Sequence, residues 1–212
     1  MAVQLTLIRH GESIWNATGR TQGHAPVPLS ERGQEQARLA AEALRGDGPY
    51  TALYSSDLLR CRQTVAPIAA VFGLDVTYDA RLREIDVGTW QGLTWDERLE
   101  YDAANHEAFT TDPFNVVLPG GESTRQMTER VQAGLEDILA AHPDGHVVIV
   151  AHGGSIRGIL RYFDLWEPRF WGPGLPTLHN TCRTVLQVAE VGDTAQVLMS
   201  ADVSHLPPEL IT

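Results

Sequence analysis

The stretch Val3-Gln4-Leu5-Thr6-Leu7-Ile8-Arg9-His10-Gly11-Glu12 is an apolar run that ends abruptly in charged and reactive residues. Its apolar part has the composition of a buried β-strand. In an open α/β sheet the carboxyl ends of the strands face the binding crevice, so a histidine directly after a strand is presented to a ligand. Taken alone, the stretch leaves two interpretations open: a functional histidine, or a capped strand end followed by a solvated turn.

Alternating strand and helix patterns extend from this stretch over the rest of the chain. We predict strands at 51–55, 74–78, 146–151, 184–188 and 196–201, the last two joined by a hairpin through Gly192-Asp193. We predict helices between Ser30 and Gly46, at 57–72, from Ser123 onward and at 155–164. This alternation predicts an α/β fold, a three-layer α/β/α sandwich with a mostly parallel central sheet.

Residues 86–121 interrupt this alternation. They follow neither the helical nor the strand period and are rich in tryptophan, acids and glycine. We interpret them as a small cap inserted into a single domain that spans residues 1–212, because the length suits one core.

The charge balance narrows the classes of partner and chemistry. A formal net charge of -11 argues against nucleic-acid and anionic membrane partners, which basic patches attract. All 16 basic residues are arginine, so enzymes that depend on a Schiff-base or Walker lysine are excluded. No apolar run reaches the length of a membrane span and no leader pattern is seen, so we expect a cytoplasmic protein. Cys61 and Cys182 lie far apart and are expected to be free thiols.

Three further places carry a reactive polar residue just beyond a predicted strand. Arg60 falls in the first turn of a helix, where backbone N–H groups already favour an anion. Glu84 follows the third strand, and His152 precedes Gly153-Gly154 at a helix start. Each has an ordinary alternative: a surface ion pair, a solvated carboxylate or a turn. Together with His10 they match a phosphoryl-transfer site, with a nucleophile, cations for the phosphoryl oxygens and an acid for the leaving group.

In these segments the chain resembles the histidine phosphatase superfamily, which includes the cofactor-dependent phosphoglycerate mutases. The resemblance rests on motifs that follow the family's order over most of the chain: Leu7–Glu12, Ser55-Ser56 with Arg60 and Gln63-Thr64, Glu84, and His152-Gly153. It implies a phosphoglycerate mutase-like fold. Pro26 departs from the pattern, because many members carry Asp there.

The resemblance also implies roles for individual residues. His10 would attack phosphorus and become a phosphohistidine, with a backbone carbonyl or other acceptor fixing its tautomer. Glu84 would protonate the leaving alkoxide and then take a proton from water, so we expect a partly desolvated carboxyl with a raised pKa. Arg9, Arg60 and His152 would hold the phosphoryl oxygens. Further substrate contacts are expected from Asn16, Gln22, Gly23 and Gly153. We expect no metal and no cofactor, because the eight histidines form no metal-ligand motif.

The composition of the cap bears on the reaction. Between Asp86 and Gly120 there are seven acids and one cation, Arg98, a net charge of -6, which argues against a second anionic group in the substrate. Aromatic residues of the cap suit an organic alcohol at the cavity mouth, or simply pack the cap onto the core. Residues 82–97 and 201–205 also look more like the phosphatase members of the family.

We therefore predict a metal-independent phosphomonoesterase that hydrolyses a small organic phosphate ester. A phosphoglycerate mutase is the first alternative. A non-catalytic module that binds a phospho-ligand or a protein is the second, although such a module would not need both His10 and Glu84. A sugar phosphate, a phosphorylated glycerate conjugate, a nucleotide and a cofactor-precursor phosphate all remain open as substrates. The oligomeric state is also open, with a homodimer as one option.

Overall fold

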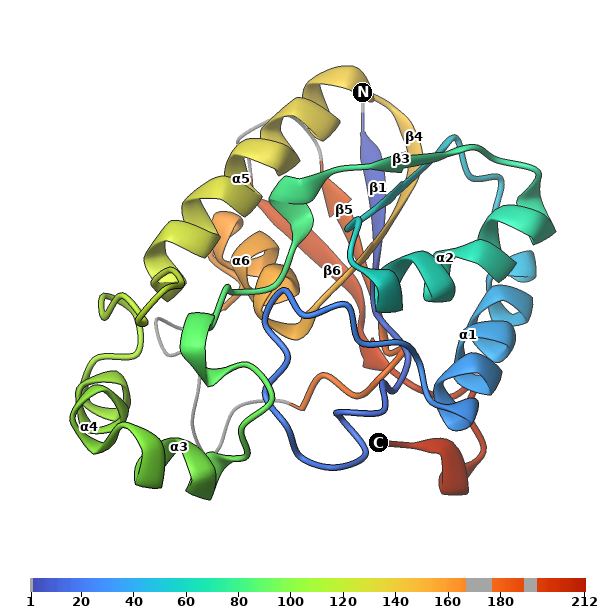
Figure 1. Cartoon of the computed structure of the whole chain (residues 1–212). Helices are drawn as coiled ribbons and strands as arrows, with labels where there is room; N and C mark the ends of the chain where they lie inside the picture. Colours follow the sequence, from blue (N-terminus) through green and yellow to red (C-terminus); the bar gives the residue numbers. More distant parts are fainter. Residues whose placement is uncertain (1, 167–176, 189–193) are drawn as a thin grey trace.

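A six-stranded mixed sheet forms the centre of the computed structural model, which describes residues 2–166, 177–188 and 194–212 (Figure 1). The strands are β1 (Val3–Arg9), β2 (Ala52–Ser55), β3 (Val76–Tyr78), β4 (Gly145–Ala151), β5 (Arg183–Val188) and β6 (Ala195–Asp202). They lie in the order β3-β2-β4-β1-β5-β6. The first four in this order are parallel, and β5 and β6 join antiparallel at one edge.

Helices cover both faces of the sheet. α1 (Glu31–Ala43) and α2 (Leu59–Phe72) lie together on one face, and α5 (Thr124–Ala141) and α6 (Gly153–Tyr162) lie on the other (Figure 1). The predicted three-layer sandwich with a mostly parallel sheet is confirmed. The hairpin β5–β6 is antiparallel as predicted, but its turn at Gly192-Asp193 lies outside the described residues. No helix in the described part of the chain is long and apolar enough to cross a membrane.

Side chains alternate along the central strands and fill two cores. Leu5 and Leu7 of β1 pack with α5 and α6, whereas Ile8 packs with α1 and α2. In β4, Val147 and Ile149 face the first core, and Val148 and Val150 face the second. Because both faces of β4 are covered, its sequence is a continuous apolar run.

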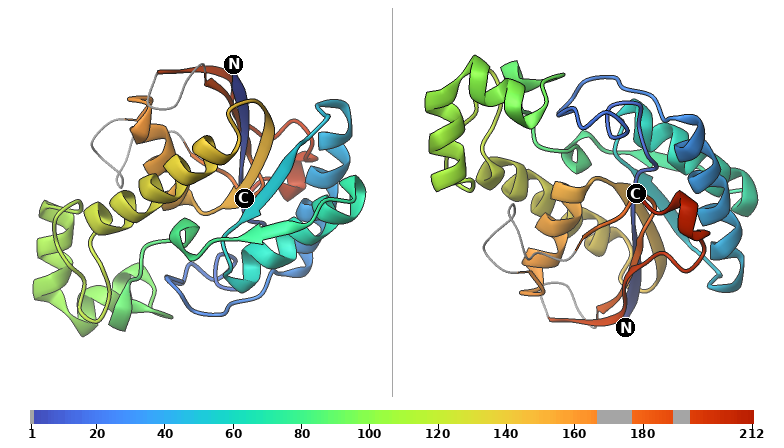
Figure 2. Two further views of the ribbon diagram at one scale, coloured as in Figure 1. Left: turned by 90° about the horizontal axis from the view of Figure 1, so that it is seen from above. Right: turned by 90° about the horizontal axis from the view of Figure 1, so that it is seen from below.

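Residues 86–121 contain more regular structure than their sequence pattern suggests. It includes a 3₁₀ turn, Gly88–Trp90, and the short helices α3 (Trp95–Tyr101) and α4 (Ala103–Thr111), which lie apart from the sheet (Figure 2). Thr94 and Glu97 form a capping box that begins α3. The helical period is absent because no residue of α3 is buried and α4 buries only His106 and Phe109.

The parallel register brings the predicted site residues to one edge of the sheet. Arg9 at the end of β1 pairs with Ala151 at the end of β4, so the histidines that follow both strands become neighbours. Ser55 at the end of β2 pairs with Val150, and Tyr78 at the end of β3 pairs with Ser55. The sequence segments that follow these strands therefore start from adjacent points.

Candidate active site

A cavity of about 610 Å³ opens at this edge and is lined in part by residues 86–121. Its size is that of a small-molecule site. Seven of the nine predicted site residues form part of its wall, namely Arg9, His10, Asn16, Gln22, Gly23, Arg60 and Glu84. Trp90, Trp95 and Phe109 of this segment form aromatic walls. Trp90 and Phe109 also belong to the hydrophobic core, so the same side chains line the cavity and pack this segment onto the core.

The ring of His10 is held in one tautomer. Its Nδ1 donates a hydrogen bond to the Gly11 carbonyl at 2.7 Å, so the lone pair is on Nε2. Asn180 supports the loop by donating from Nδ2 to the His10 carbonyl at 2.9 Å. Arg60 Nε lies 3.3 Å from His10 Nε2 and donates to it. The structure thus matches the expected fixing of the tautomer by a backbone acceptor.

Electrostatics keep His10 neutral. Burial, and then the charges of Arg60 and Arg9, hold the pKa of His10 well below its usual value. A neutral imidazole with its lone pair on Nε2 is the state that a nucleophile requires.

Arg60 is buried at the first turn of α2 and is positioned by the loop that contains Gly23. Its Nη2 donates to the Gly23 carbonyl at 2.9 Å, and its Nη1 donates to the Ala25 carbonyl at 3.4 Å. Gly23 has a φ of +50°, and a Cβ there would crowd Val87. Gly23, which was predicted to contact the substrate, thus supplies a carbonyl that orients Arg60.

Arg9 is partly buried at the end of β1. Its Nη1 donates to the Leu178 carbonyl at 2.5 Å, while its Nε is buried without a hydrogen-bond partner among the described residues. Burial lowers the pKa of its guanidinium, but an arginine at the cavity wall stays charged. An incoming anion would find at this wall two arginines flanking a neutral histidine.

His152 lies beside His10 but behind the cavity wall. The two ring centroids are 5.1 Å apart in an edge-on arrangement, and His152 Nε2 is 2.8 Å from Ser56 Oγ. Burial, followed by the charge of Arg60, holds the pKa of His152 well below its usual value, so this ring is also neutral. Neither His152 nor Gly153 is among the residues that line the cavity, so their predicted contacts with the phosphoryl group and the substrate stay predictions.

Glu84 presents a partly buried carboxylate to the cavity from the loop after β3. The Gly154 N–H at the start of α6 donates to its Oε2 at 3.0 Å, and the Ile85 N–H donates to its Oε1 at 3.0 Å. A side chain at Gly154 would overlap the carboxylate. Glu84 is thus partly buried, and two backbone donors fix the orientation of its carboxylate.

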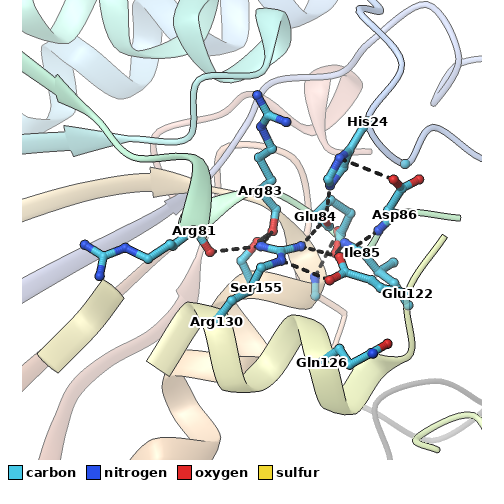
Figure 3. Close-up of polar contacts among 12 residues, drawn as sticks. His24, Arg81, Arg83, Glu84, Ile85, Asp86, Glu122, Gln126, Arg130 and Ser155 are labelled. Carbon is cyan, nitrogen blue, oxygen red and sulfur yellow. Dashed lines mark hydrogen bonds and ion pairs between the residues drawn. The ribbon is translucent and has the colours of Figure 1, made fainter. Parts of the chain in front are cut away.

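Arg130 of α5 holds the loop that carries Glu84 (Figure 3). It donates to the carbonyls of Arg81 at 2.9 Å, Arg83 at 2.8 Å and Glu84 at 2.7 Å. Glu122 pairs with the same guanidinium and accepts from the Asp86 N–H at 2.9 Å. We name Arg130 and Glu122 the loop clamp, since together they fix the backbone on both sides of Glu84.

Asn16 and Gln22 meet at the hydroxyl of Ser13. Ser13 Oγ lies 3.1 Å from Asn16 Oδ1 and 2.8 Å from Gln22 Oε1, and the Ser13 N–H also donates to Asn16 Oδ1. Because both amide oxygens are used in this way, the amide nitrogens are the groups that each side chain can offer to a ligand.

Several residues that shape the site were not predicted from the sequence. Thr64, quoted only as part of a motif, accepts the Gly11 N–H at 3.0 Å and donates to the Arg60 carbonyl at 2.7 Å. Asn180 precedes a strand in the chain, which was a usable signal. Arg130 had no such signal, because an arginine on the polar face of a helix looks like a surface ion pair.

Among the described residues no group of three or more His, Cys, Asp or Glu side chains could hold a metal ion.

Known proteins are similar to this chain in both sequence and fold. The model of the histidine phosphatase superfamily (branch 1) matches residues 5–200. A metal-independent phosphoserine phosphatase of Arabidopsis thaliana is 39% identical over 206 residues, 96% of this chain and 83% of that protein. Phosphoglycerate mutase-like protein 4 of the same plant is 34% identical over 205 residues, 96% of this chain and 86% of that protein. A mycobacterial glucosyl-3-phosphoglycerate phosphatase has a structure similar at a TM-score of 0.80, with 31% identity over 94% of this chain and 98% of its own.

The chain belongs to the histidine phosphatase superfamily. The predicted family is confirmed, and so is the prediction of a hydrolase of the phosphatase type.

Proposed function

We propose that this phosphatase hydrolyses a small organic phosphate ester through a phosphohistidine at His10. In the first step Nε2 of His10 bonds to phosphorus, the ester P–O bond breaks, and Glu84 gives a proton to the departing alcohol oxygen. In the second step Glu84 takes a proton from water, the water oxygen bonds to phosphorus, and the N–P bond breaks. The products are the alcohol and inorganic phosphate.

The orientation of His10 carries this proposal. Its Nδ1 is committed to the Gly11 carbonyl, its Nε2 lone pair is beside Arg60, and its pKa is depressed. A histidine that merely bound phosphate would act best as a charged donor. This one is neutral and carries its lone pair on the nitrogen next to the cations.

Two arginines support the transition state in this proposal. The Arg60 Nε–H, which donates to His10 Nε2 in the free site, becomes available to a phosphoryl oxygen when Nε2 attacks. Arg9 supplies a second charge from the end of β1, at the same edge of the sheet, and the amide nitrogens of Asn16 and Gln22 supply neutral donors. The ring of His152 lies 5.1 Å from that of His10 between centroids, and we propose that His152 also holds a phosphoryl oxygen.

The substrate class rests on the cavity and on the relatives. We propose that residues 86–121 act as a cap over the leaving alcohol, because Trp90, Trp95 and Phe109 line the cavity. The related proteins are named for phosphoserine and for glucosyl-3-phosphoglycerate, which are small organic esters. The net charge of -11 supports a small molecule rather than nucleic acid or an anionic membrane as partner. A cytoplasmic location stays a prediction.

Hydrolysis of p-nitrophenyl phosphate tests the reaction. We expect phosphate release that a chelator leaves unchanged and that His10→Ala abolishes, with no loss of folded protein by circular dichroism. Rapid quenching with ³²P-labelled substrate should trap label on the protein that survives base and is lost in acid, as a phosphoramidate is. Unaltered hydrolysis by His10→Ala contradicts the proposal. Formation of 2-phosphoglycerate from 3-phosphoglycerate and a bisphosphoglycerate primer, faster than phosphate release, supports the mutase alternative.

A further inference from the structure

Arg98 is the one charged residue of residues 86–120 on the wall of the cavity that also contains His10. None of the seven acids of this segment belongs to that wall. Several of them have structural roles instead: Glu97 closes the capping box of α3, and Asp102 caps α4. Asp112 accepts from the side chain of Asn115. The net charge of the cap is therefore not the charge that a substrate meets.

The guanidinium of Arg98 is held by aromatic faces rather than by a carboxylate. Its Cζ is 4.4 Å from the ring centroid of Trp95 and 5.2 Å from that of Trp90. Among the described residues, its buried Nε has no hydrogen-bond partner and no carboxylate lies within ion-pair distance of its guanidinium. Burial alone shifts its pKa, downward, with no contribution from a nearby acid.

Arg20, the other cavity arginine outside the phosphoryl site, is different. Its guanidinium pairs with Glu97, with Nη1 at 2.7 Å from Oε2 and Nη2 at 3.3 Å from Oε1. Its Nη1 also donates to the Gly92 carbonyl at 2.6 Å. The charge of Arg20 is balanced by the protein, whereas that of Arg98 is not balanced within the described residues.

We propose that Arg98 binds a carboxylate of the substrate, so that the substrate is the phosphate ester of a small hydroxy acid or of a hydroxyl-bearing amino acid. This inference rests on the proposed function, because the same cavity must hold the phosphoryl group at His10. A single arginine carries one positive charge, which matches a carboxylate better than a second phosphate, and its planar edge can form paired hydrogen bonds to two oxygens.

Matched pairs of esters test the proposal. O-phosphoserine and O-phosphoethanolamine differ only in the carboxylate, and 3-phosphoglycerate and glycerol 3-phosphate form a second pair with and without one. We expect the wild type to prefer the carboxylate member of at least one pair by about ten-fold or more in kcat/KM. Arg98→Gln should reduce that ratio about ten-fold or more, mainly through KM, and Arg98→Lys should reduce it less because charge remains.

Arg38→Gln is the matched control, because Arg38 pairs with Glu35 on the outer surface of α1 and should leave the ratio unchanged. Melting temperatures of all variants show whether each is folded. A wild type without preference, or an Arg98→Gln ratio equal to that of the wild type, overturns the carboxylate site. A higher kcat/KM for a bisphosphate ester than for O-phosphoserine and 3-phosphoglycerate also overturns it. Failure to hydrolyse any ester, p-nitrophenyl phosphate included, overturns the proposed function itself and with it this inference.

Discussion

The backbone N–H of Gly154 donates to Oε2 of Glu84 at 3.0 Å, at a point where any side chain on residue 154 would overlap the carboxylate. The backbone at the start of α6 therefore fixes the position of the proposed proton donor, Glu84. Gly154→Ala should displace Glu84 and lower kcat by about 100-fold, since a shift of about 1 Å in a catalytic group has that effect. Steady-state kinetics with p-nitrophenyl phosphate measure it.

Gly158→Ala is the control for this change. Gly158 lies in the same helix, and its new Cβ would meet Val131 Cγ1 at 3.5 Å, an ordinary contact. It should leave kcat unchanged and raise the free energy of unfolding by up to about 1 kcal/mol. Equal kcat values for Gly154→Ala and the wild type would show that the reaction does not require the Glu84 carboxylate to lie against the Gly154 N–H.

Arg130→Gln should weaken both the fold and the reaction. The substitution removes donors to three loop carbonyls and leaves the partly buried Glu122 without its cation. We expect a loss of about 2 kcal/mol or more in the free energy of unfolding and a fall in kcat larger than the change in KM. Urea unfolding and kinetics check the two effects. Arg38→Ala removes an exposed surface ion pair and should change neither the free energy of unfolding nor the kinetics. An Arg130→Gln variant as stable and active as this control would contradict the role of the loop clamp.

Stability should depend on pH through the two buried histidines. Burial and Arg60 hold the pKa values of His10 and His152 well below the unfolded value of about 6.5, so below that pH the unfolded chain binds protons that the folded chain does not. The free energy of unfolding is therefore greatest above pH ~6.5 and falls on acidification by about 1.4 kcal/mol per pH unit for each histidine.

Urea unfolding of the wild type and of His10→Gln, at about pH 7.5 and about pH 5.5, isolates one of these contributions because the carboxylates titrate alike in both proteins. We expect a shallower pH dependence for His10→Gln. An identical dependence in the two proteins would mean that His10 accepts its proton as readily in the fold as in the unfolded chain.

Thr64→Val tests the link between the His10 loop and α2. The valine keeps the shape of the side chain but leaves the buried Gly11 N–H and Arg60 carbonyl without the Thr64 hydroxyl. A loss of about 1–3 kcal/mol in the free energy of unfolding is expected. Thr77→Val, on the exposed strand β3, is the control, and its free energy of unfolding should stay within about 0.5 kcal/mol of the wild-type value. An equally small change for Thr64→Val would rule out the link between the His10 loop and α2.

The cap shows where sequence reasoning reaches its limit. Its composition, seven acids against one arginine, argued against a second anionic group in the substrate. In the structure several of these acids cap helices or turns and none lines the cavity, whereas Arg98 does, so the total charge of the segment differs from the charge at the cavity. Thr94-Trp95-Asp96-Glu97 was a readable capping signal for α3, but nothing in the sequence showed which way the helix would face.

The sequence by itself determined the layered fold and the positions after the strands, namely His10, Arg60, Glu84 and His152, because strand and helix periods and the residues that end them are local features. Only the tertiary structure decided that Gly154 and Arg130 hold Glu84, that His152 stands behind His10 and that Arg98 reaches the cavity. These contacts join segments far apart in the chain. They follow from how strands and helices pack, which no local pattern encodes.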